Sequence, residues 1–306
     1  MSSLIQCSQF ADLPNGMRLH FASAGAPGRP MVLFVHGFPE AWFAWEAQLE
    51  AFGANFYAVA VDLRGFNLSA KPADLDAYRP KKIVEDLAML IAHLGYRETR
   101  IVAHDWGGAL TWNLAIFAPQ CVRKLVIVNA PHPYLFAREL SENPAQQRAS
   151  AYMNWLRKPG SEQLLAEHEF GRLDAMFRAG AGADHWYGAA LRARYHAMWS
   201  IPGEHGSHGL TGGVNYYRAS PLHPATEQEP RAPGARMLAQ DWVTRVPVRV
   251  IWGMRDTALL PSLLDGLDSL CPDLRISRIA DGSHWVIHEQ PAHVNALIAA
   301  ALDESG

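Results

Sequence analysis

An aspartate stands at a predicted strand-to-helix corner about one third of the way along the chain. In RIVAHDWGGALTW (100–112), an apolar run reaches Asp105 and continues as a segment with helical character. Small residues surround that position, with Ala103 before it and Gly107 and Gly108 after it. A turn with this pattern of small residues pushes the central side chain out at the carboxyl edge of a sheet. Asp105 is therefore a candidate nucleophile, with an ordinary helix N-cap as the alternative explanation.

A carboxylate at such a corner favours attack on a saturated carbon. A serine that attacked this kind of carbon would form a stable ether and inactivate itself. A carboxylate forms an ester instead, and water can later cleave that ester at its carbonyl carbon. Asp105 therefore predicts a two-step substitution with a covalent ester intermediate.

Three further segments carry polar residues directly after predicted strands. HGFP (36–39) follows one apolar run, WGMRD ends at Asp256, and DGSHW places His284 after the next run. Because the carboxyl ends of parallel strands meet at one edge of an open sheet, we expect Asp105, Asp256 and His284 to lie close together. The order acid, acid, histidine predicts a nucleophile, an orienting acid and a general base.

Apolar runs alternate with helical patterns through most of the chain. Segment 15–25 predicts an antiparallel strand, because apolar and polar residues alternate after a hairpin signal. Strands are predicted at 31–37, 56–62, 100–104, 123–130, 246–256 and 274–280, and three of them, 31–37, 56–62 and 246–256, have the pattern of buried strands. Helices are predicted at 41–52, 80–95 and 106–119, between the last two strands, and from about Pro291. This alternation predicts an α/β protein, a mostly parallel sheet flanked by helices.

The alternation breaks over residues 132–240. This segment is rich in Tyr, Trp, His, Pro and Gly, and it has helical patches without a strong strand pattern. We therefore predict an α/β core made of residues 1–131 and 241–306. A mostly helical cap, residues 132–240, is inserted into this core and is expected to lie over it.

The composition is that of a globular protein with a sizeable core. Of the 306 residues, 49% are hydrophobic and 19% charged, and a formal net charge of −3 predicts no nucleic-acid partner. No stretch approaches the roughly 20 apolar residues that cross a membrane, and the first residues lack the pattern of a signal peptide. Cys7, Cys121 and Cys271 are widely spaced, which favours buried reduced thiols over a metal cluster. We expect a cytoplasmic protein without a metal.

Six motifs spread over nearly the whole chain carry a family resemblance. They are HGFPEAW (36–42), DLRGFNLSAKP (62–72), AHDWGGA (103–109), NAPHP (129–133), WGMRD (252–256) and GSHWVIHEQP (282–291). With these motifs the chain resembles the epoxide hydrolase branch of the α/β-hydrolase fold, a branch that also holds haloalkane and fluoroacetate dehalogenases. The resemblance implies an α/β-hydrolase fold with Asp105 as nucleophile, His284 as general base and Asp256 orienting His284.

The resemblance also implies proton donors in the cap. Epoxide hydrolases carry one tyrosine seven residues before a Pro-Gly pair, which is Tyr152 in YMNWLRKPG (152–160). They carry another in an Asn–aromatic–Tyr–Arg motif, which is Tyr217 in GGVNYYRAS (212–220). Both hydroxyls would donate to the epoxide oxygen. Packing within the cap is the alternative explanation for either tyrosine alone.

The remaining site residues follow from the same resemblance. Backbone N–H groups of Phe38 and Trp106 would form the oxyanion hole. The side chains of Trp106, Phe38 and Trp155 would contact the substrate, a small apolar epoxide. Water is the second reactant, no cofactor is implied, and no oligomeric state is predicted.

Two other functions stay open. A haloalkane or haloacid dehalogenase uses the same Asp–His–Asp arrangement, and the indole N–H of Trp106 could hold a halide. Against it, Trp106 and Ala109 stand where fluoroacetate dehalogenases carry arginines, and Tyr152 and Met153 replace their His-Trp pair. Phe38 stands where many haloalkane dehalogenases carry asparagine. The third possibility is a non-catalytic ligand receptor on the same fold.

Overall fold

The computed structural model of the chain describes residues 5–180, 186–227 and 237–303. Its centre is an eight-stranded sheet in the order β1-β2-β4-β3-β5-β6-β7-β8. β1, β2 and β4 pair antiparallel, and all neighbours from β4 to β8 pair in parallel. The strands are β1 (Gln6–Asp12), β2 (Arg18–Ala24), β3 (Met31–Val35), β4 (Tyr57–Val61), β5 (Thr99–His104), β6 (Val122–Val128), β7 (Val248–Gly253) and β8 (Leu274–Ile279). The predicted mostly parallel α/β architecture is confirmed.

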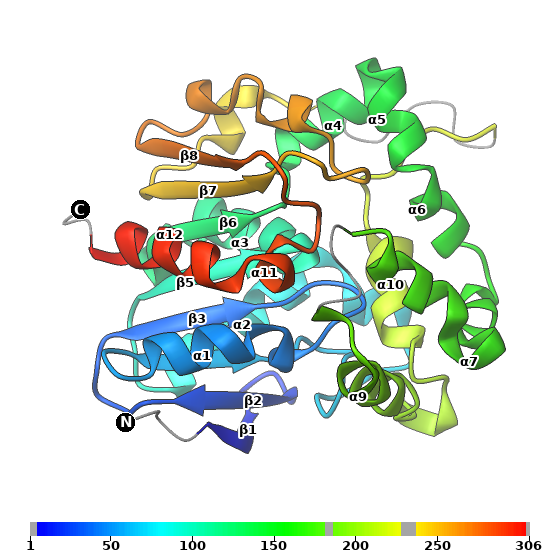
Figure 1. Cartoon of the computed structure of the whole chain (residues 1–306), viewed down its shortest axis with the longest axis horizontal. Coiled ribbons are helices and arrows are strands. Elements are labelled where there is room, and N and C mark those ends of the chain that lie inside the picture. The colour runs from blue at the N-terminus through cyan, green and yellow to red at the C-terminus, as the bar shows by residue number, and fades with distance from the viewer. Residues whose placement is uncertain (1–4, 181–185, 228–236, 304–306) are drawn as a thin grey trace.

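Helices cover both faces of this sheet (Figure 1). One face carries α1 (Glu46–Phe52), α11 (Val286–Glu289) and α12 (Pro291–Asp303). The opposite face carries α2 (Pro80–His93) and α3 (Asp105–Phe117). Strands that are covered on both faces read as continuous apolar runs, which is why the inner strands could be recognised in the sequence.

A series of helices is inserted between β6 and β7. They are α4 (Pro133–Glu142), α5 (Pro144–Ala149), α6 (Ala151–Leu156), α7 (Ser161–Arg178), α9 (Ala189–Trp199) and α10 (Thr211–Ala219). They lie on the side toward which the arrows of β3 and β7 point (Figure 1). The described residues of this insertion form no strand. The division into a core and a cap at 132–240 remains a prediction.

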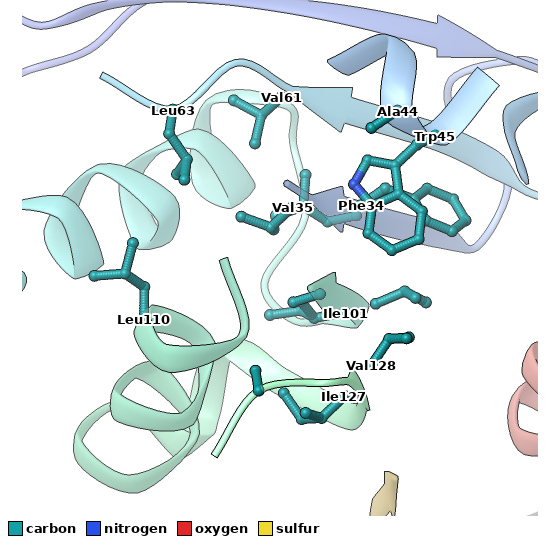
Figure 2. Close-up of a cluster of buried hydrophobic side chains, with 14 of the residues drawn as sticks. Phe34, Val35, Ala44, Trp45, Val61, Leu63, Ile101, Leu110, Ile127 and Val128 are labelled. Carbon is teal, nitrogen blue, oxygen red and sulfur yellow. The ribbon is translucent and has the colours of Figure 1, made fainter. Parts of the chain in front are cut away.

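The inner strands are held by a large apolar cluster (Figure 2). β3 and β4 are buried at every residue, and the ring centroids of Phe34 and Trp45 lie 5.4 Å apart. Ile101, Ile127 and Leu110 bring β5, β6 and α3 into the same cluster. Each such side chain contributes roughly 1.5–3 kcal/mol when it is fully buried. The loops at the strand ends therefore start from rigid elements.

The observed fold differs from the predicted secondary structure at one helix and at one edge strand. The helix expected between β7 and β8 is replaced by two short 3₁₀ turns, Pro261–Leu264 and Leu267–Ser269. Gly266 separates them with a φ of +84°, a left-handed conformation that no continuous helix contains. β1 was not predicted, because this edge strand is mostly exposed and carries no core periodicity.

The cysteines differ from the expected buried thiols at two positions. All three are free, and Cys271 is buried, but Cys121 is half-buried and Cys7 is exposed on the edge strand β1. Every helix in the described part of the chain is too short or too polar to span a membrane.

Candidate active site

Loops from four parallel strands converge at one edge of the sheet. Phe38 follows β3, Asp105 follows β5, Asp256 follows β7 and His284 follows β8. These strands are neighbours apart from β6, which lies between β5 and β7. Ligands bind at this edge in open α/β sheets, because the chain leaves the carboxyl end of each strand there.

Asp105 occupies a tight corner between β5 and α3. Its φ is +51°, whereas His104 before it is extended. A side chain at Gly107 would place its Cβ 2.3 Å from the carbonyl oxygen of Val35, and one at Gly108 would meet the Cβ of Ala130 at 2.2 Å. Glycine is therefore required at both positions, since a side chain there would keep α3 from starting this close to the neighbouring segments.

Asp256 is buried and fully hydrogen-bonded. Its Oδ1 accepts hydrogen bonds from the backbone N–H groups of Ala258 and Leu259, each at 2.9 Å. Its Oδ2 accepts one from the side-chain amide of Asn129 at 2.8 Å and lies 2.7 Å from Nδ1 of His284. Burial favours the neutral acid, but His284 and these donors outweigh it and lower the pKa of Asp256. As an anion, Asp256 can therefore hold His284 in one orientation.

His284 lies between two carboxylates. Nδ1 faces Asp256, and Nε2 is 3.7 Å from Oδ2 of Asp105. Burial opposes the charged imidazole, but the two aspartates, with Asp256 the stronger, raise the pKa of His284 to about 9. With Asp105 as an anion, His284 is thus protonated at neutral pH.

Backbone amides surround the Asp105 carboxylate. The N–H of Phe38 donates to Oδ1 of Asp105 at 2.7 Å. α3 begins at Asp105, so the N–H of Trp106 belongs to the first helical turn, where amides have no partner within the helix. Both amides expected from the sequence thus lie at this corner, and the Phe38 amide contacts the carboxylate.

The two tyrosines come from inserted helices and face the same corner. Tyr152 lies in α6 and Tyr217 in α10, with ring centroids 6.0 Å apart. The Tyr217 ring packs edge-on against Trp106 at 5.1 Å and Phe38 at 5.3 Å. Burial raises the pKa of both hydroxyls, and the negative charge of Asp105 raises them further. Both tyrosines are therefore held as protonated hydroxyls that can donate.

Two cavities meet at these residues. The first has a volume of about 290 Å³ and is lined by Trp106, and the second has about 600 Å³ and is lined by Phe38, Trp155 and His284. Asp105, Tyr152 and Tyr217 line both cavities. All three side chains expected to contact substrate therefore face one cavity or the other.

Glu40 is a buried acid that was not predicted as a site residue. Its side chain is 0% exposed. Oε1 lies 2.6 Å from Nε2 of His288 and accepts a hydrogen bond from the hydroxyl of Tyr195 at 3.0 Å, and Oε2 lies 3.3 Å from Nδ1 of His104. Nε2 of His104 is in turn 2.8 Å from the carbonyl oxygen of His284. Glu40 thus supports the backbone of the candidate base through His104.

The charge of Glu40 also acts on the site. Burial alone would raise its pKa, but His288 and His104 hold it well below its usual range. The resulting anion adds to the groups that raise the pKa of His284. The one sequence signal was a carboxylate within the otherwise apolar HGFPEAW, because a buried acid requires partners.

The loop that carries His284 is held from a second direction by Glu289. The Glu289 carboxylate accepts hydrogen bonds from the backbone N–H of Ser283 at 2.8 Å and from the Ser283 hydroxyl at 2.5 Å.

Within residues 5–180, 186–227 and 237–303, no group of three or more His, Cys, Asp or Glu side chains could hold a metal ion.

The sheet order, the corner at Asp105 and the helices inserted before β7 define the class, an α/β hydrolase. Residues 30–291 match the family model described as the alpha/beta hydrolase fold. The chain is 32% identical over 290 residues to the AB hydrolase superfamily protein YfhM of Bacillus subtilis, with 94% of this chain and 95% of that protein covered.

Other relatives are named epoxide hydrolases. Epoxide hydrolase 4 of Mus musculus is 30% identical, with 95% of this chain and 77% of that protein covered. Epoxide hydrolase 1 of Caenorhabditis elegans is 31% identical, with 94% of this chain and 68% of that protein covered. The crystal structure of an epoxide hydrolase from Bacillus megaterium, in complex with an inhibitor, has a TM-score of 0.86 at 35% identity, covering 97% of this chain and 100% of that one. The chain therefore belongs to the α/β-hydrolase fold family and, within it, to the epoxide hydrolases.

Proposed function

We propose that this protein hydrolyses an epoxide to a vicinal diol through a covalent ester on Asp105. The observation that carries the proposal is the pair of hydroxyls, Tyr152 and Tyr217, that share both cavities with Asp105. A nucleophile on one side of the substrate and two protonated donors on the other suit an epoxide. When its ring opens, the oxygen leaves one carbon as an alkoxide that needs a proton, and it stays bonded to the other carbon. Relatives and similar structures named epoxide hydrolases support the same activity.

In the first step, the Asp105 carboxylate attacks one ring carbon and the bond from that carbon to the epoxide oxygen breaks. The oxygen takes a proton from Tyr152 or Tyr217, leaving a hydroxyalkyl ester and a tyrosinate. Because the pKa of both tyrosines is raised, the tyrosinate is a strong base and is protonated again. The proton held by His284 is available for this purpose.

Ester formation removes the negative charge of Asp105, and this prepares the second step. Without that charge the pKa of His284 falls, so transfer of its proton to the tyrosinate becomes easier and leaves a neutral imidazole that can act as a base. His284, oriented by Asp256, then takes a proton from water as the water attacks the ester carbonyl. The N–H groups of Phe38 and Trp106 stabilise the oxyanion that forms. Collapse releases the diol alkoxide, which takes the proton from His284. The Asp105 carboxyl keeps the second proton of the attacking water and passes it to His284, so that Asp105 is again an anion and His284 is again protonated.

Mass spectrometry of a His284→Gln variant tests the covalent step. With an apolar epoxide we expect an adduct on Asp105 whose added mass equals that of the substrate, because ester cleavage lacks its base. A single turnover of excess wild-type enzyme in heavy-oxygen water complements it. The first diol should be unlabelled and Asp105 should carry the label. Label in the first diol would show that water attacks the epoxide directly and would end the proposal.

The dehalogenase alternative is separated by its product. Haloalkanes and haloacids are incubated beside epoxides, and halide release and diol formation are both measured. Diol without halide is the expected result. Halide release without diol would assign the Asp105 site to dehalogenation, and failure to bind covalently or turn over any substrate would favour a ligand receptor.

A further inference from the structure

The two cavities that meet at Asp105 differ in charge. Apart from Asp105 itself, the described residues that line the first cavity include no charged side chain. The second cavity is lined by two arginines, Arg172 and Arg255, and again by no acid other than Asp105 among its described lining residues. Beyond the candidate triad itself, one side of the site is therefore apolar, and the other carries two arginines.

Arg255 has a charge that is not neutralised by an ion pair. It follows β7 directly before Asp256, its side chain is exposed, and its backbone N–H donates to the carbonyl oxygen of Gly282 at 2.8 Å. Its guanidinium makes no ion pair with any residue that the structure describes. The charge of Arg255 is one of the causes that lower the pKa of Asp281, but the Asp281 carboxylate accepts its hydrogen bond from the side chain of Gln290, at 3.0 Å. The Arg255 guanidinium is thus available to a ligand.

Arg172 reaches the same cavity from α7. Its Nε donates to the carbonyl oxygen of Leu164 at 3.1 Å, and its guanidinium carbon lies 5.8 Å from the centroid of the Trp155 ring. Its ion pair with Glu167 is long at 3.8 Å, and both side chains are about half exposed. A guanidinium has five N–H donors in a fork that matches a carboxylate. Most of these donors on Arg172 remain available.

We propose that the substrate is an internal epoxide with an anionic group at one end, an inference that rests on the proposed function. Since Asp105, Tyr152 and Tyr217 line both cavities, a reacting ring held by them has its two carbons facing opposite cavities. An apolar substituent on one carbon fits the first cavity. A chain on the other carbon runs through the second cavity and ends in a carboxylate or similar anion at Arg172 and Arg255.

The test compares two probes of equal length. One is an internal epoxide with a short alkyl group on one ring carbon and a chain ending in a carboxylate on the other, and the second is its primary amide. For wild type at low salt we expect kcat/KM to be about fivefold to tenfold higher for the acid than for the amide. The ratio should fall toward one as salt is raised, because salt screens half-exposed charges.

Variants locate the effect. Arg172→Gln with Arg255→Gln should bring the acid-to-amide ratio close to one, whereas Arg172→Lys with Arg255→Lys should keep part of it. Arg123→Gln is the matched control, because it removes an exposed arginine that lines neither cavity. It should leave the ratio unchanged. If the glutamine variant does not fold, the acid-to-amide ratio of the lysine variant and its salt dependence in wild type still test the proposal.

The outcomes distinguish this inference from the proposed function. Equal turnover of acid and amide by wild type, or a ratio that survives in the double glutamine variant, would overturn the anion site while epoxide hydrolysis stands. If neither the two probes nor simple apolar epoxides are hydrolysed or form an adduct, the proposed function fails and the anion site falls with it.

Discussion

Nε2 of His284 lies 3.7 Å from Oδ2 of Asp105. This separation is too long for a hydrogen bond but short enough for the charge of the carboxylate to act strongly on the imidazole. The other ring nitrogen, Nδ1, is 2.7 Å from Asp256. The charge of Asp105 therefore adds to that of Asp256 in raising the pKa of His284, and ester formation would remove the contribution of Asp105.

Asp105→Asn is expected to lower the pKa of His284 from about 9, because it mimics the loss of charge in the ester. Imidazole NMR titration measures this shift. Turnover should fall by about a thousandfold or more, as for other nucleophile variants. Asp268→Asn, which removes an exposed carboxylate, is the control. An unchanged His284 pKa in Asp105→Asn would contradict the coupling.

The same pKa predicts how stability depends on pH. The pKa of His284 is raised from 6.5 to about 9 in the folded protein, so protonated His284 stabilises the fold fully below about pH 6.5. This contribution, about 3 kcal/mol at most, is lost as the pH rises through about 9. Denaturant unfolding of wild type and His284→Gln over this range measures it. A difference between the two proteins that stays constant with pH would rule the effect out.

Tyr217→Phe and Tyr152→Phe should each slow ring opening by about a hundredfold and leave ester hydrolysis much less affected. The reason is that the hydroxyls donate to the epoxide oxygen only in the first step. Rapid-mixing kinetics that follow the enzyme's tryptophan fluorescence can separate the two steps. Tyr134→Phe removes a hydroxyl that lines neither cavity and should change neither rate. A defect confined to ester hydrolysis would contradict the assigned role of the tyrosines.

Glu40→Gln should destabilise the fold by about 3–5 kcal/mol, since it breaks a buried hydrogen-bond network around a charged carboxylate. If the variant folds, the pH profile of ester hydrolysis should shift to lower pH, because Glu40 helps to raise the pKa of His284. A purely structural role would not move that profile. Glu50→Gln, at an exposed position of α1, is the matched control for both measurements.

Gly107→Ala should destabilise the protein by roughly 2 kcal/mol or more, or prevent folding, because the new Cβ would lie 2.3 Å from a backbone carbonyl oxygen that cannot move away. Gly188→Ala is the matched control, since its Cβ would meet no heavy atom within 4 Å. Thermal unfolding of both variants measures the difference. Equal stability of the two would show that the corner at Asp105 tolerates a side chain.

The candidate triad and the sheet could be predicted because their signals are local. β3, β5, β6 and β7 are short, largely apolar runs, and Asp105 directly follows β5 while Asp256 stands a few residues beyond β7. His284 stands a few residues beyond β8, the strand that follows β7. Covering helices bury both faces of a parallel sheet, so its strands are apolar throughout and easy to find. The exposed edge strand β1 and the 3₁₀ turns after β7 lack such a pattern, and both were missed.

The network of Glu40 and the unequal charge of the two cavities became visible only in three dimensions. Glu40 meets His288 across 248 positions of the chain and Tyr195 across 155. Arg172 and Arg255 line one cavity although α9, α10 and β7 lie between them in the sequence. Burial, pKa and cavity charge depend on which distant side chains exclude water from a group. Spacing within short segments of the sequence identifies the candidate reacting residues. The packing of segments far apart in the sequence determines the burial and the electrostatic surroundings of those residues.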